Sequence, residues 1–450
     1  MRLALVFLAG LALALPARAE PFGAEPAQVE PRAGIEIVPV TSEGGITAWL
    51  VEDHTIPIVT LEGSFRGGAS LDPADEAGAT ALMATLLGEG AGDLDRTGFA
   101  EALETLASSV GFSAGADGVS VSATTLAENL DETFDLLRLA LSEPRFDAES
   151  LARARARQLA TLRSDETNPN RLASRAFYAR AFEGHPYAIP ADGTLESVAA
   201  LDRGAVLDAH ESALARDRLM LAVVGAIGPG ELGPLLDATF GALPLAGAPL
   251  PETAEAAAAG TVSVIDLDIP QSVVMFGHRG IARDDEDFIP AFIMDHILGG
   301  GGFGSRLTEE IRERRGLTYG VSTWLASSDY GWLYMGAFSS ANARAAEAIE
   351  LVRAEWARMA GQGVSAAELD TAKRYLTGAY PLRFDGNARI AGQILGLQTA
   401  GLGIDYVRER NALIEAVTAE DIARVARRLL DPDALSFVVV GAPEGIEQTP

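Results

Sequence analysis

The feature that most constrains the fold of this chain is an internal repeat that relates its two halves at an offset of 213 residues. At that offset Ile56-Pro57 aligns with Ile269-Pro270, Arg66-Gly67 aligns with Arg279-Gly280, and Gly118 aligns with Gly331. Similar elements follow these matches in the same order in both halves. A repeat of this length predicts two homologous domains in one chain.

Each half has the pattern strand, strand, helix, strand and then a helical section. The segments that we expect to be strands are 35–38, 46–51, 58–63, 119–124 and 332–338, and those that we expect to be helices are 76–87, 130–141 and 345–359, with further helices beginning at Asp147 and Ser365. This order predicts an α+β fold, in which each domain is an antiparallel-leaning sheet with helices packed on one face. Two such domains would form half of a clamshell. We place the N-terminal domain at residues 34–242, an Ala-, Pro- and Gly-rich linker at 243–260 and the C-terminal domain at 261–450.

The first residues predict export. Residues 1–19 have a basic start, a short apolar run and the small-residue pattern Ala17-x-Ala19, which is typical of a cleavable signal peptide, and residues 20–33 would form an N-terminal extension. An uncleaved anchor helix is the alternative, but the apolar run is short for a bilayer. We therefore expect a periplasmic protein with no membrane insertion after cleavage.

Charge limits the classes of partner. The formal net charge is −28, and removal of the two arginines of residues 1–19 takes it to −30. Such a chain is poorly suited to bind nucleic acid or anionic lipid. The charge is compatible with cationic peptides or a basic partner, although solubility alone also explains it.

The residue inventory argues against a metal site built from this chain alone. The chain has no cysteine and five histidines, none of which form a pair four residues apart on a helix. Composition does not exclude a Ser-His-Asp arrangement, but no Gly-x-Ser-x-Gly nucleophile elbow stands out, and the glycine-rich run 299–304 lacks the Lys-Ser/Thr of a phosphate loop. This run could equally be a flexible turn.

A more specific pattern follows the glycine run. Residues 305–315 have a helical pattern that Gly316 would end, and residues 317–325 have a strand pattern. Arg312 and Tyr319 would therefore lie near one helix–strand junction and could converge. The alternative is a solvated arginine and a half-buried tyrosine with no shared role.

The segment from Gly299 to Tyr319 resembles the C-terminal-domain signature of the pitrilysin/insulinase peptidases, in the branch that contains the mitochondrial processing peptidases. Segments 63–70 and 182–187 and the repeat itself also fit this family, so the resemblance covers nearly the whole chain after residue 19. It implies that Arg312 and Tyr319 bind the substrate carbonyl and stabilise the oxyanion. The substrate-binding positions that we expect beside them are Gly299, Gly300, Gly301 and Gly302.

The first half departs from the family at the zinc site. Active members carry His-x-x-Glu-His where this chain has Ala81, Ala84 and Thr85 at the histidine and glutamate positions, and a further zinc-binding glutamate where this chain reads Leu-Ala-Thr-Leu at 159–162. The resemblance therefore implies a family member without its own metal. We expect no cofactor in this chain and zinc in a partner subunit.

The remaining histidines and a basic run have ordinary interpretations. We expect His185 to be structural, and we expect His54, His210, His278 and His296 to be surface or satisfied side chains. Arg153, Arg155 and Arg157 are expected to lie on a solvated helix face.

Two functional hypotheses follow. The first is a non-catalytic subunit that binds an extended peptide and supplies Arg312 and Tyr319 to the active site of a homologous, zinc-bearing subunit. The alternative is a peptide-binding or chaperone-like clamshell with no proteolytic role. A third hypothesis, an independent zinc peptidase, conflicts with the missing ligands.

Overall fold

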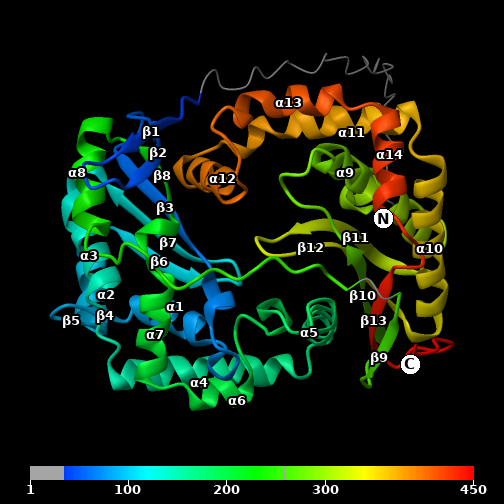
Figure 1. Ribbon diagram of the computed structural model, residues 1–450, viewed down its shortest axis with the longest axis horizontal. Coiled ribbons are helices and arrows are strands. Elements are labelled where there is room, and N and C mark those ends of the chain that lie inside the picture. Colours follow the sequence, from blue (N-terminus) through cyan, green and yellow to red (C-terminus); the bar gives the residue numbers. More distant parts are fainter. Residues whose placement is uncertain (1–34, 258–259, 450) are drawn as a thin grey trace, which may run out of the picture. The chain divides into compact units, whose positions relative to one another are not determined.

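The computed structural model describes residues 35–257 and 260–449, so the predicted signal peptide and almost all of the extension lie outside the described residues. Residues from Glu36 onward form one compact unit. Helices and strands of this unit build two mixed sheets with packed helices, which confirms the predicted α+β class (Figure 1). In the part of the chain that is described, no helix is long and apolar enough to span a bilayer.

The first sheet has the order β1-β2-β8-β3-β7-β6, and all its neighbours pair antiparallel except β2 and β8. Its strands are β1 (Val38–Thr41), β2 (Thr47–Glu52), β3 (Ile58–Arg66), β6 (Ser109–Ala114), β7 (Gly118–Leu126) and β8 (Leu219–Gly225). Two short strands of two residues each, β4 (Gly90–Ala91) and β5 (Leu94–Asp95), form a separate hairpin. The helices of this half are α1 (Ala79–Leu87), α2 (Arg96–Thr105), α3 (Leu130–Ser142), α4 (Ala148–Asp165), α5 (Pro169–Ala181), α6 (Leu195–Ala200), α7 (Arg203–Ala213) and α8 (Pro229–Phe240).

The second sheet has the order β11-β12-β10-β13-β9, with only β13 and β9 parallel. Its strands are β9 (Val262–Asp266), β10 (Gln271–Arg279), β11 (Thr318–Ser327), β12 (Trp332–Ala341) and β13 (Ser436–Gly441). Its α-helices are α9 (Phe288–Asp295), α10 (Ala345–Gln362), α11 (Ala366–Ala379), α12 (Asn387–Thr399), α13 (Tyr406–Ala416) and α14 (Ala419–Leu429). Five strands of the first sheet have a counterpart in the same order in the second sheet, as the repeat predicts, and β1 is an additional strand of the first sheet.

The offset of the repeat is not constant, however. β3 and β10 are related by 213 residues at both ends, but Arg66 pairs with Gly118 whereas Arg279 pairs with Leu333. The structural partner of Gly118 is therefore Leu333 and not Gly331, because two extra residues precede β12. The offset reaches 218 residues at α5 and α12.

Each half contributes one helix to the sheet of the other half. Helix α5 packs on β10 and β13, and helix α12 packs on β3 and β8 (Figure 1). In β10 the buried side chains alternate between two clusters: Val274 and Phe276 join the helices of their own half, and Val273 joins Phe177 of α5. The expectation of helices on one face thus holds for most of the helices of each half, and the exchanged helix covers the opposite face.

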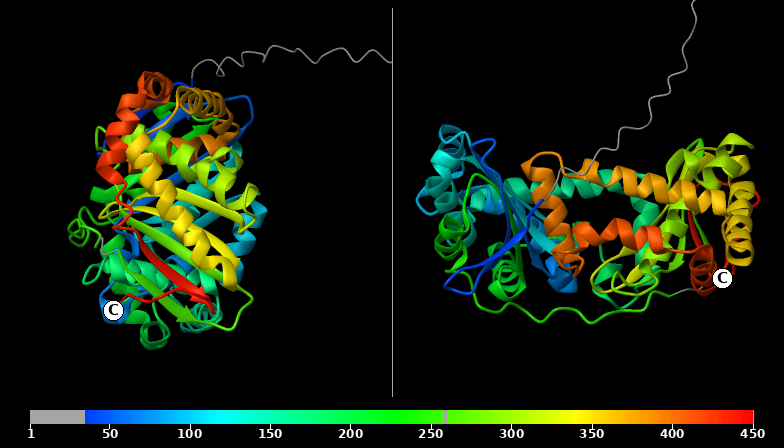
Figure 2. Two further views of the ribbon diagram at one scale, coloured as in Figure 1. Left: turned by 90° about the vertical axis from the view of Figure 1, so that its right-hand side faces the viewer. Right: turned by 90° about the horizontal axis from the view of Figure 1, so that it is seen from above.

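Polar contacts reinforce the exchange. The Asn387 side chain donates to the carbonyl of Ile58 at 3.2 Å, and the Gln398 side chain donates to the carbonyl of Leu221 at 2.9 Å. Residues 241–257 contain no helix or strand, and Figure 2 (right-hand view) shows this segment as an extended green trace. Backbone hydrogen bonds fix it to both halves: the Ala248 amide donates to the Ser212 carbonyl at 3.2 Å, and the Ala254 amide donates to the Tyr330 carbonyl at 2.7 Å.

Local boundaries agree with the sequence patterns to within a few residues. Asp147 and Ser365 each precede a helix, and Ser365 forms a capping box with Glu368. The first strand begins at Val38 rather than residue 35, and α1 begins at Ala79 rather than residue 76 because Gly78 adopts a φ of +92°. The helix expected at 305–315 is π-wound over Thr308–Glu313, a winding that the apolar spacing did not indicate.

Candidate functional site

The positions of the lost zinc motif lie in a hollow of about 330 Å³ between α1, α4 and the edge strand β6. Ala81 and Thr85 face this hollow from consecutive turns of α1, as the spacing of four residues requires. Ala84 is buried in the core of the same half. The residues that complete the lining are Phe112, Ser113 and Ala114 of β6, Ala154, Arg157, Gln158 and Thr161 of α4, and Asp192.

Helix α1 is held in place at its N-terminus by one carboxylate. Asp72 accepts hydrogen bonds from the amides of Gly78 at 3.0 Å and Thr80 at 3.2 Å, and from the Thr80 hydroxyl. Burial raises the pKa of Asp72 to about 6, although these hydrogen bonds oppose the shift. At the other end the Thr85 hydroxyl donates to the Ala81 carbonyl at 3.1 Å, so it is occupied within the helix.

The hollow does not fit a zinc ion. Zinc in proteins takes imidazole, thiolate or carboxylate ligands, and Ala81, Ala84, Thr85 and Thr161 supply none of these. Asp192 is the one carboxylate in the lining, and a single carboxylate beside the positive Arg157 does not make the set of three or four ligands that zinc needs. Among the described residues no cluster of three or more His, Asp or Glu side chains could hold a metal.

Helix α4 contributes more to the hollow than the sequence comparison indicated. Of the four residues at 159–162, only Thr161 lines it, and Arg157 and Gln158 precede that range. Arg153 and Arg157 both bind Glu89 at 3.1 Å. Burial alone would raise the pKa of Glu89, but the hydrogen bonds from these arginines lower it. The expected solvated face is therefore wrong in part, because these two arginines hold a carboxylate.

Arg312 and Tyr319 lie on either side of the turn at Gly316, which has a φ of +61° and ends the π-wound segment as the sequence predicts. Tyr319 is 86% exposed and sits at a bulge of β11, the edge strand of the second sheet. Arg312 lies over the ring of Phe303 at 4.5 Å and contacts Glu313 at 3.3 Å. Within the described residues no hydrogen bond joins Arg312 to Tyr319, and their convergence on a substrate stays a prediction.

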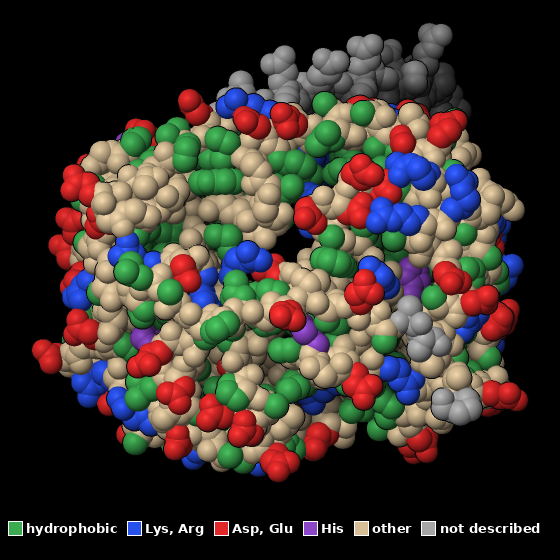
Figure 3. All heavy atoms as spheres, viewed as in Figure 1, with side chains coloured by type: hydrophobic (Ala, Val, Ile, Leu, Met, Phe, Trp, Pro, Cys, Tyr) green, Lys and Arg blue, Asp and Glu red, His purple; other side chains and the backbone are tan. Residues whose placement is uncertain are grey.

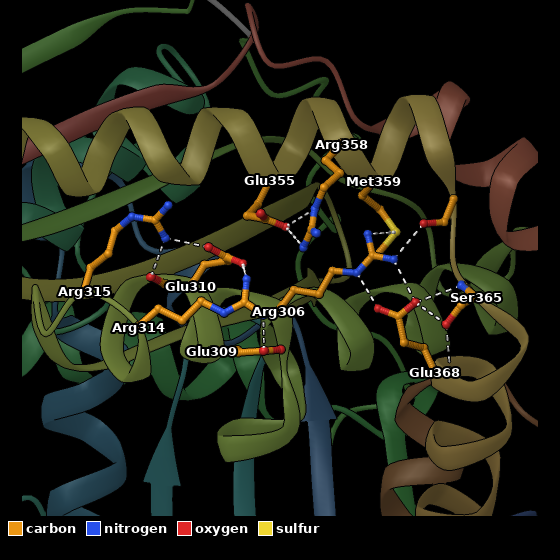
Figure 4. Close-up of polar contacts among 11 residues, drawn as sticks. Arg306, Glu309, Glu310, Arg314, Arg315, Glu355, Arg358, Met359, Ser365 and Glu368 are labelled. Atoms are coloured by element: carbon orange, nitrogen blue, oxygen red, sulfur yellow. Dashed lines mark hydrogen bonds and ion pairs between the residues drawn. The ribbon is translucent and has the colours of Figure 1, made fainter.

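The segment that carries Arg312 is anchored to two helices behind it (Figure 4). Arg306 binds Glu368 of α11 at 2.6 Å and 3.0 Å and donates to the Gly363 carbonyl at 2.8 Å. Hydrogen bonding from Arg306 is the main reason that the pKa of Glu368 falls to about 2. Glu310 binds Arg315 at 2.5 Å and also contacts Arg314 (Figure 4). The other arginines named here thus form ion pairs with buried or half-buried carboxylates. The acidic neighbour of Arg312 is Glu313, which is exposed.

The glycine run has a packing reason that is independent of substrate. A Cβ atom on Gly299 would collide with the Thr323 hydroxyl, and one on Gly300 would collide with the Asp295 carboxylate. Gly301 is close to the His296 carbonyl, and Gly302 has a φ of +61°. The structure therefore explains why each is glycine and leaves their predicted role in substrate binding untested.

The His185 loop connects the two halves. His185 contacts the Glu252 carbonyl at 3.0 Å, and the neighbouring Tyr187 donates to Asp117 and accepts from the Tyr330 amide at 2.9 Å. Arg66 completes the connection by binding Asp329 at 2.8 Å. His185 is thus structural, as expected from the loop pattern.

The same connection borders a cavity of about 770 Å³, lined in part by Arg66, Asp117 and Asp329, that the sequence analysis did not identify. Its lining comes from both halves, and sequence spacing alone cannot bring such distant residues together.

The other histidines have partners in the fold. His54 binds Glu52 at 2.8 Å on the surface, His210 contacts the Leu141 carbonyl at 2.7 Å, and His296 stacks on Tyr375. His278 accepts from the Trp356 indole at 2.9 Å, so its other ring nitrogen donates to the Arg279 carbonyl at 2.7 Å. Burial lowers the pKa of His278, which keeps this buried ring neutral.

Comparison with known proteins agrees with this geometry. Residues 200–376 match the family model described as the peptidase M16 inactive domain. A protein of Helicobacter pylori named as a non-peptidase homolog, YmxG, is 26% identical over 390 residues, which is 86% of this chain and 90% of that one. The crystal structure of a peptidase M16 inactive domain from Pseudomonas fluorescens superposes with a TM-score of 0.83 at 27% identity, over 92% of this chain and 99% of that chain.

A more distant relative is named as one subunit of an assembly. The mitochondrial-processing peptidase subunit beta of Neurospora crassa is 23% identical over 348 residues, which covers 72% of this chain and 71% of that protein. Together with the inactive-domain match, these similarities confirm the resemblance that the Gly299–Tyr319 segment suggested.

Proposed function

Because this chain is similar to an inactive domain of the M16 (pitrilysin/insulinase) peptidases and to a protein named as a non-peptidase homolog, we propose that it is a non-catalytic partner subunit of a zinc-bearing M16 homologue. The observation that carries the proposal is the division between its halves. The first half has a hollow that lacks the histidines and glutamates of the zinc motif, and the second half keeps the arginine and the tyrosine of the family signature on an anchored segment. The name of the Neurospora relative supports assembly from subunits.

In this proposal the chain binds an extended peptide by strand addition. β6 and β11 are edge strands, so each has one side without a neighbouring strand in its sheet. Backbone groups on such an edge can pair with a peptide. β6 borders the hollow at Ala81 and Thr85, and β11 carries Tyr319. A peptide paired with β6 would lie beside Ala81 and Thr85, and a peptide paired with β11 would lie beside Tyr319.

Arg312 and Tyr319 would act in trans. A guanidinium and a phenol both donate strong hydrogen bonds to the oxygen of a carbonyl that is becoming an oxyanion. The exposure of Tyr319 leaves its hydroxyl available to a substrate held by the partner. Zinc and the activated water belong to the partner subunit, because the residues of this chain do not fit the metal. The proposed location is the periplasm, which is supported by the pattern of residues 1–19.

The test uses two subunits and one matched pair of variants. The chain alone should cleave no peptide, and peptidase activity should appear when a His-x-x-Glu-His homologue from the same genome is added. Tyr319→Phe in the complex should lower kcat by about 10²–10³, the usual effect of losing one oxyanion donor. The control Tyr375→Phe removes the hydroxyl of another exposed tyrosine, on α11, and should leave kcat unchanged.

Two results would refute the proposal. Zinc-dependent cleavage by the isolated chain would assign catalysis to this chain itself. Equal rates for Tyr319→Phe and Tyr375→Phe would remove Tyr319 from the mechanism. Tight peptide binding that no zinc-bearing homologue converts to cleavage would instead favour the peptide-binding, chaperone-like alternative.

A further inference from the structure

A cavity of about 410 Å³ in the second half combines aromatic walls with three arginines. It is enclosed by α9, β11, α12 and α13, away from the hollow at Ala81 and from Arg312 and Tyr319. Its apolar lining includes the rings of Phe288, Phe292, Trp324, Tyr380 and Tyr406. A concave, mostly apolar site with a few convergent polar groups is the usual form of a ligand pocket.

The charge of this pocket is opposite to that of the chain. Arg283, Arg383 and Arg410 line it, together with a single carboxylate, Asp295. The local balance is therefore positive in a chain whose formal net charge is −28. Among the described residues none of the three arginines forms an ion pair, although most arginines of the structure do.

Two of the arginines are held in place by neutral groups. Arg283 lies over the Phe288 ring at 4.1 Å and donates to the Tyr406 hydroxyl at 3.0 Å. Arg410 is only 6% exposed, lies over the Tyr380 ring at 4.3 Å and donates to the Leu376 carbonyl at 3.2 Å. Burial lowers the pKa of Arg410, and the like charges of Arg383 and Arg283 lower it further. An anion bound beside these guanidinium groups would offset their mutual repulsion.

Among the described residues Asp295 does not form an ion pair with any of the three arginines. It accepts a hydrogen bond from the Thr323 hydroxyl at 2.6 Å. Guanidinium groups recognise carboxylates through paired hydrogen bonds, and the surrounding rings fit an apolar group. The pocket thus combines groups that bind a carboxylate with rings that bind an apolar group.

We propose that this pocket binds a carboxylate that is attached to an apolar, preferably aromatic, group. Arg283, Arg383 and Arg410 bind the carboxylate, and the aromatic wall receives the apolar group. The C-terminal residue of a polypeptide and a small aromatic acid share this chemistry. The proposal does not depend on the partner-subunit function, because the pocket is separate from the residues which that function uses.

The experiment compares acids with their amides by isothermal titration calorimetry on the full chain. The probes are N-acetyl-phenylalanine, N-acetyl-phenylalaninamide, and a pentapeptide that ends in phenylalanine as the free acid or as the amide. We expect an acid to bind at least tenfold more tightly than its amide, with an affinity that falls as salt rises. Binding of the peptide acid alone would assign a polypeptide C-terminus, and binding of both acids would include small aromatic acids.

Arg383→Gln tests the charge without disturbing the core, because Arg383 is exposed on the surface side of the pocket. This substitution should weaken acid binding by about tenfold or more and leave amide binding unchanged. The matched control is Arg389→Gln, which removes an exposed arginine at the start of α12 that does not line the pocket. Equal binding of acid and amide, no binding of either at 10 mM probe, or equal effects of the two substitutions would overturn the proposal.

Discussion

The buried carboxylate of Asp295 should make the stability of the protein depend on pH, and Asp295→Asn isolates its effect. Asp295 is 6% exposed at the C-terminal end of α9 and accepts one hydrogen bond from Thr323. Burial raises its pKa from 3.8 to about 6, and the hydrogen bond from Thr323 only partly offsets this. An asparagine at this position keeps an oxygen acceptor for Thr323 and carries no charge.

The raised pKa of Asp295 makes the folded protein less stable as pH rises. Between pH 3.8 and about 6 the folded state holds a proton that the unfolded state releases, so the free energy of unfolding falls as pH rises through this window. Above pH 6 the accumulated loss is about 3 kcal/mol, from the difference between the two pKa values. The asparagine variant avoids this loss. It should be more stable than the parent chain at pH 7 by up to about 3 kcal/mol and should lose the advantage near pH 4.

Urea unfolding, followed by tryptophan fluorescence at half-unit steps from pH 4 to pH 8, measures this difference. Asp72 also has a pKa raised to about 6, but it is present in both proteins and cancels in their difference. The control Asp370→Asn removes an exposed carboxylate on α11 that pairs with Arg374, and its difference from the parent chain should stay within about 1 kcal/mol. If Asp295→Asn is less stable at pH 7, or if its advantage does not change with pH, the reasoning about this carboxylate is wrong.

Two further substitutions test local parts of the fold. In a thermal melt, Gly225→Ala should destabilise the chain by several kcal/mol or prevent folding, because Gly225 has a φ of +140° and an added Cβ would collide with the Ile58 carbonyl. The control Gly361→Ala lies in open space on α10, and in the same melt it should be neutral or stabilise by up to about 1 kcal/mol. Glu368→Gln should cost about 1–3 kcal/mol at pH 7 because it removes the carboxylate that Arg306 binds. Since the folded pKa of Glu368 is about 2, that cost should shrink as pH falls from 4.5 towards 2, and a cost that is the same at pH 3 and pH 7 would contradict the assignment.

The sequence predicted the repeat and most local elements because these depend on short-range patterns. The repeated order of elements predicts the helices that follow Asp147 and Ser365, alternation predicts the strand 332–338, and the structure has them there. The constant offset of 213 was wrong, since insertions between elements shift the register without disturbing periodicity. The exchange of α5 and α12 between sheets could not be predicted, because their apolar faces do not indicate which sheet they cover.

The candidate site was predictable to the extent that residue identity decides chemistry. Alanines at positions 81 and 84 exclude metal ligation whatever the fold. The roles of Arg157 and of the pocket at Arg410 needed coordinates, because each depends on neighbours that are distant in the sequence. The position of Tyr319 at a bulge of an edge strand also appears only in the structure, since the strand pattern continues through it.

The loss of zinc binding in the first half is more than the loss of three ligands. Active chemistry at this place needs a site that attracts a cation, and here the α4 wall presents Arg157 to the hollow. The same arginine joins Arg153 in holding Glu89, so its charge is part of the packing between α4 and the end of α1. Restoring histidines and a glutamate on α1 would still leave the site without the further carboxylate ligand that is missing at 159–162 of α4, and with Arg157 on its wall. Retention of Arg312 and Tyr319 by the other half is consistent with a function that is completed by a second chain.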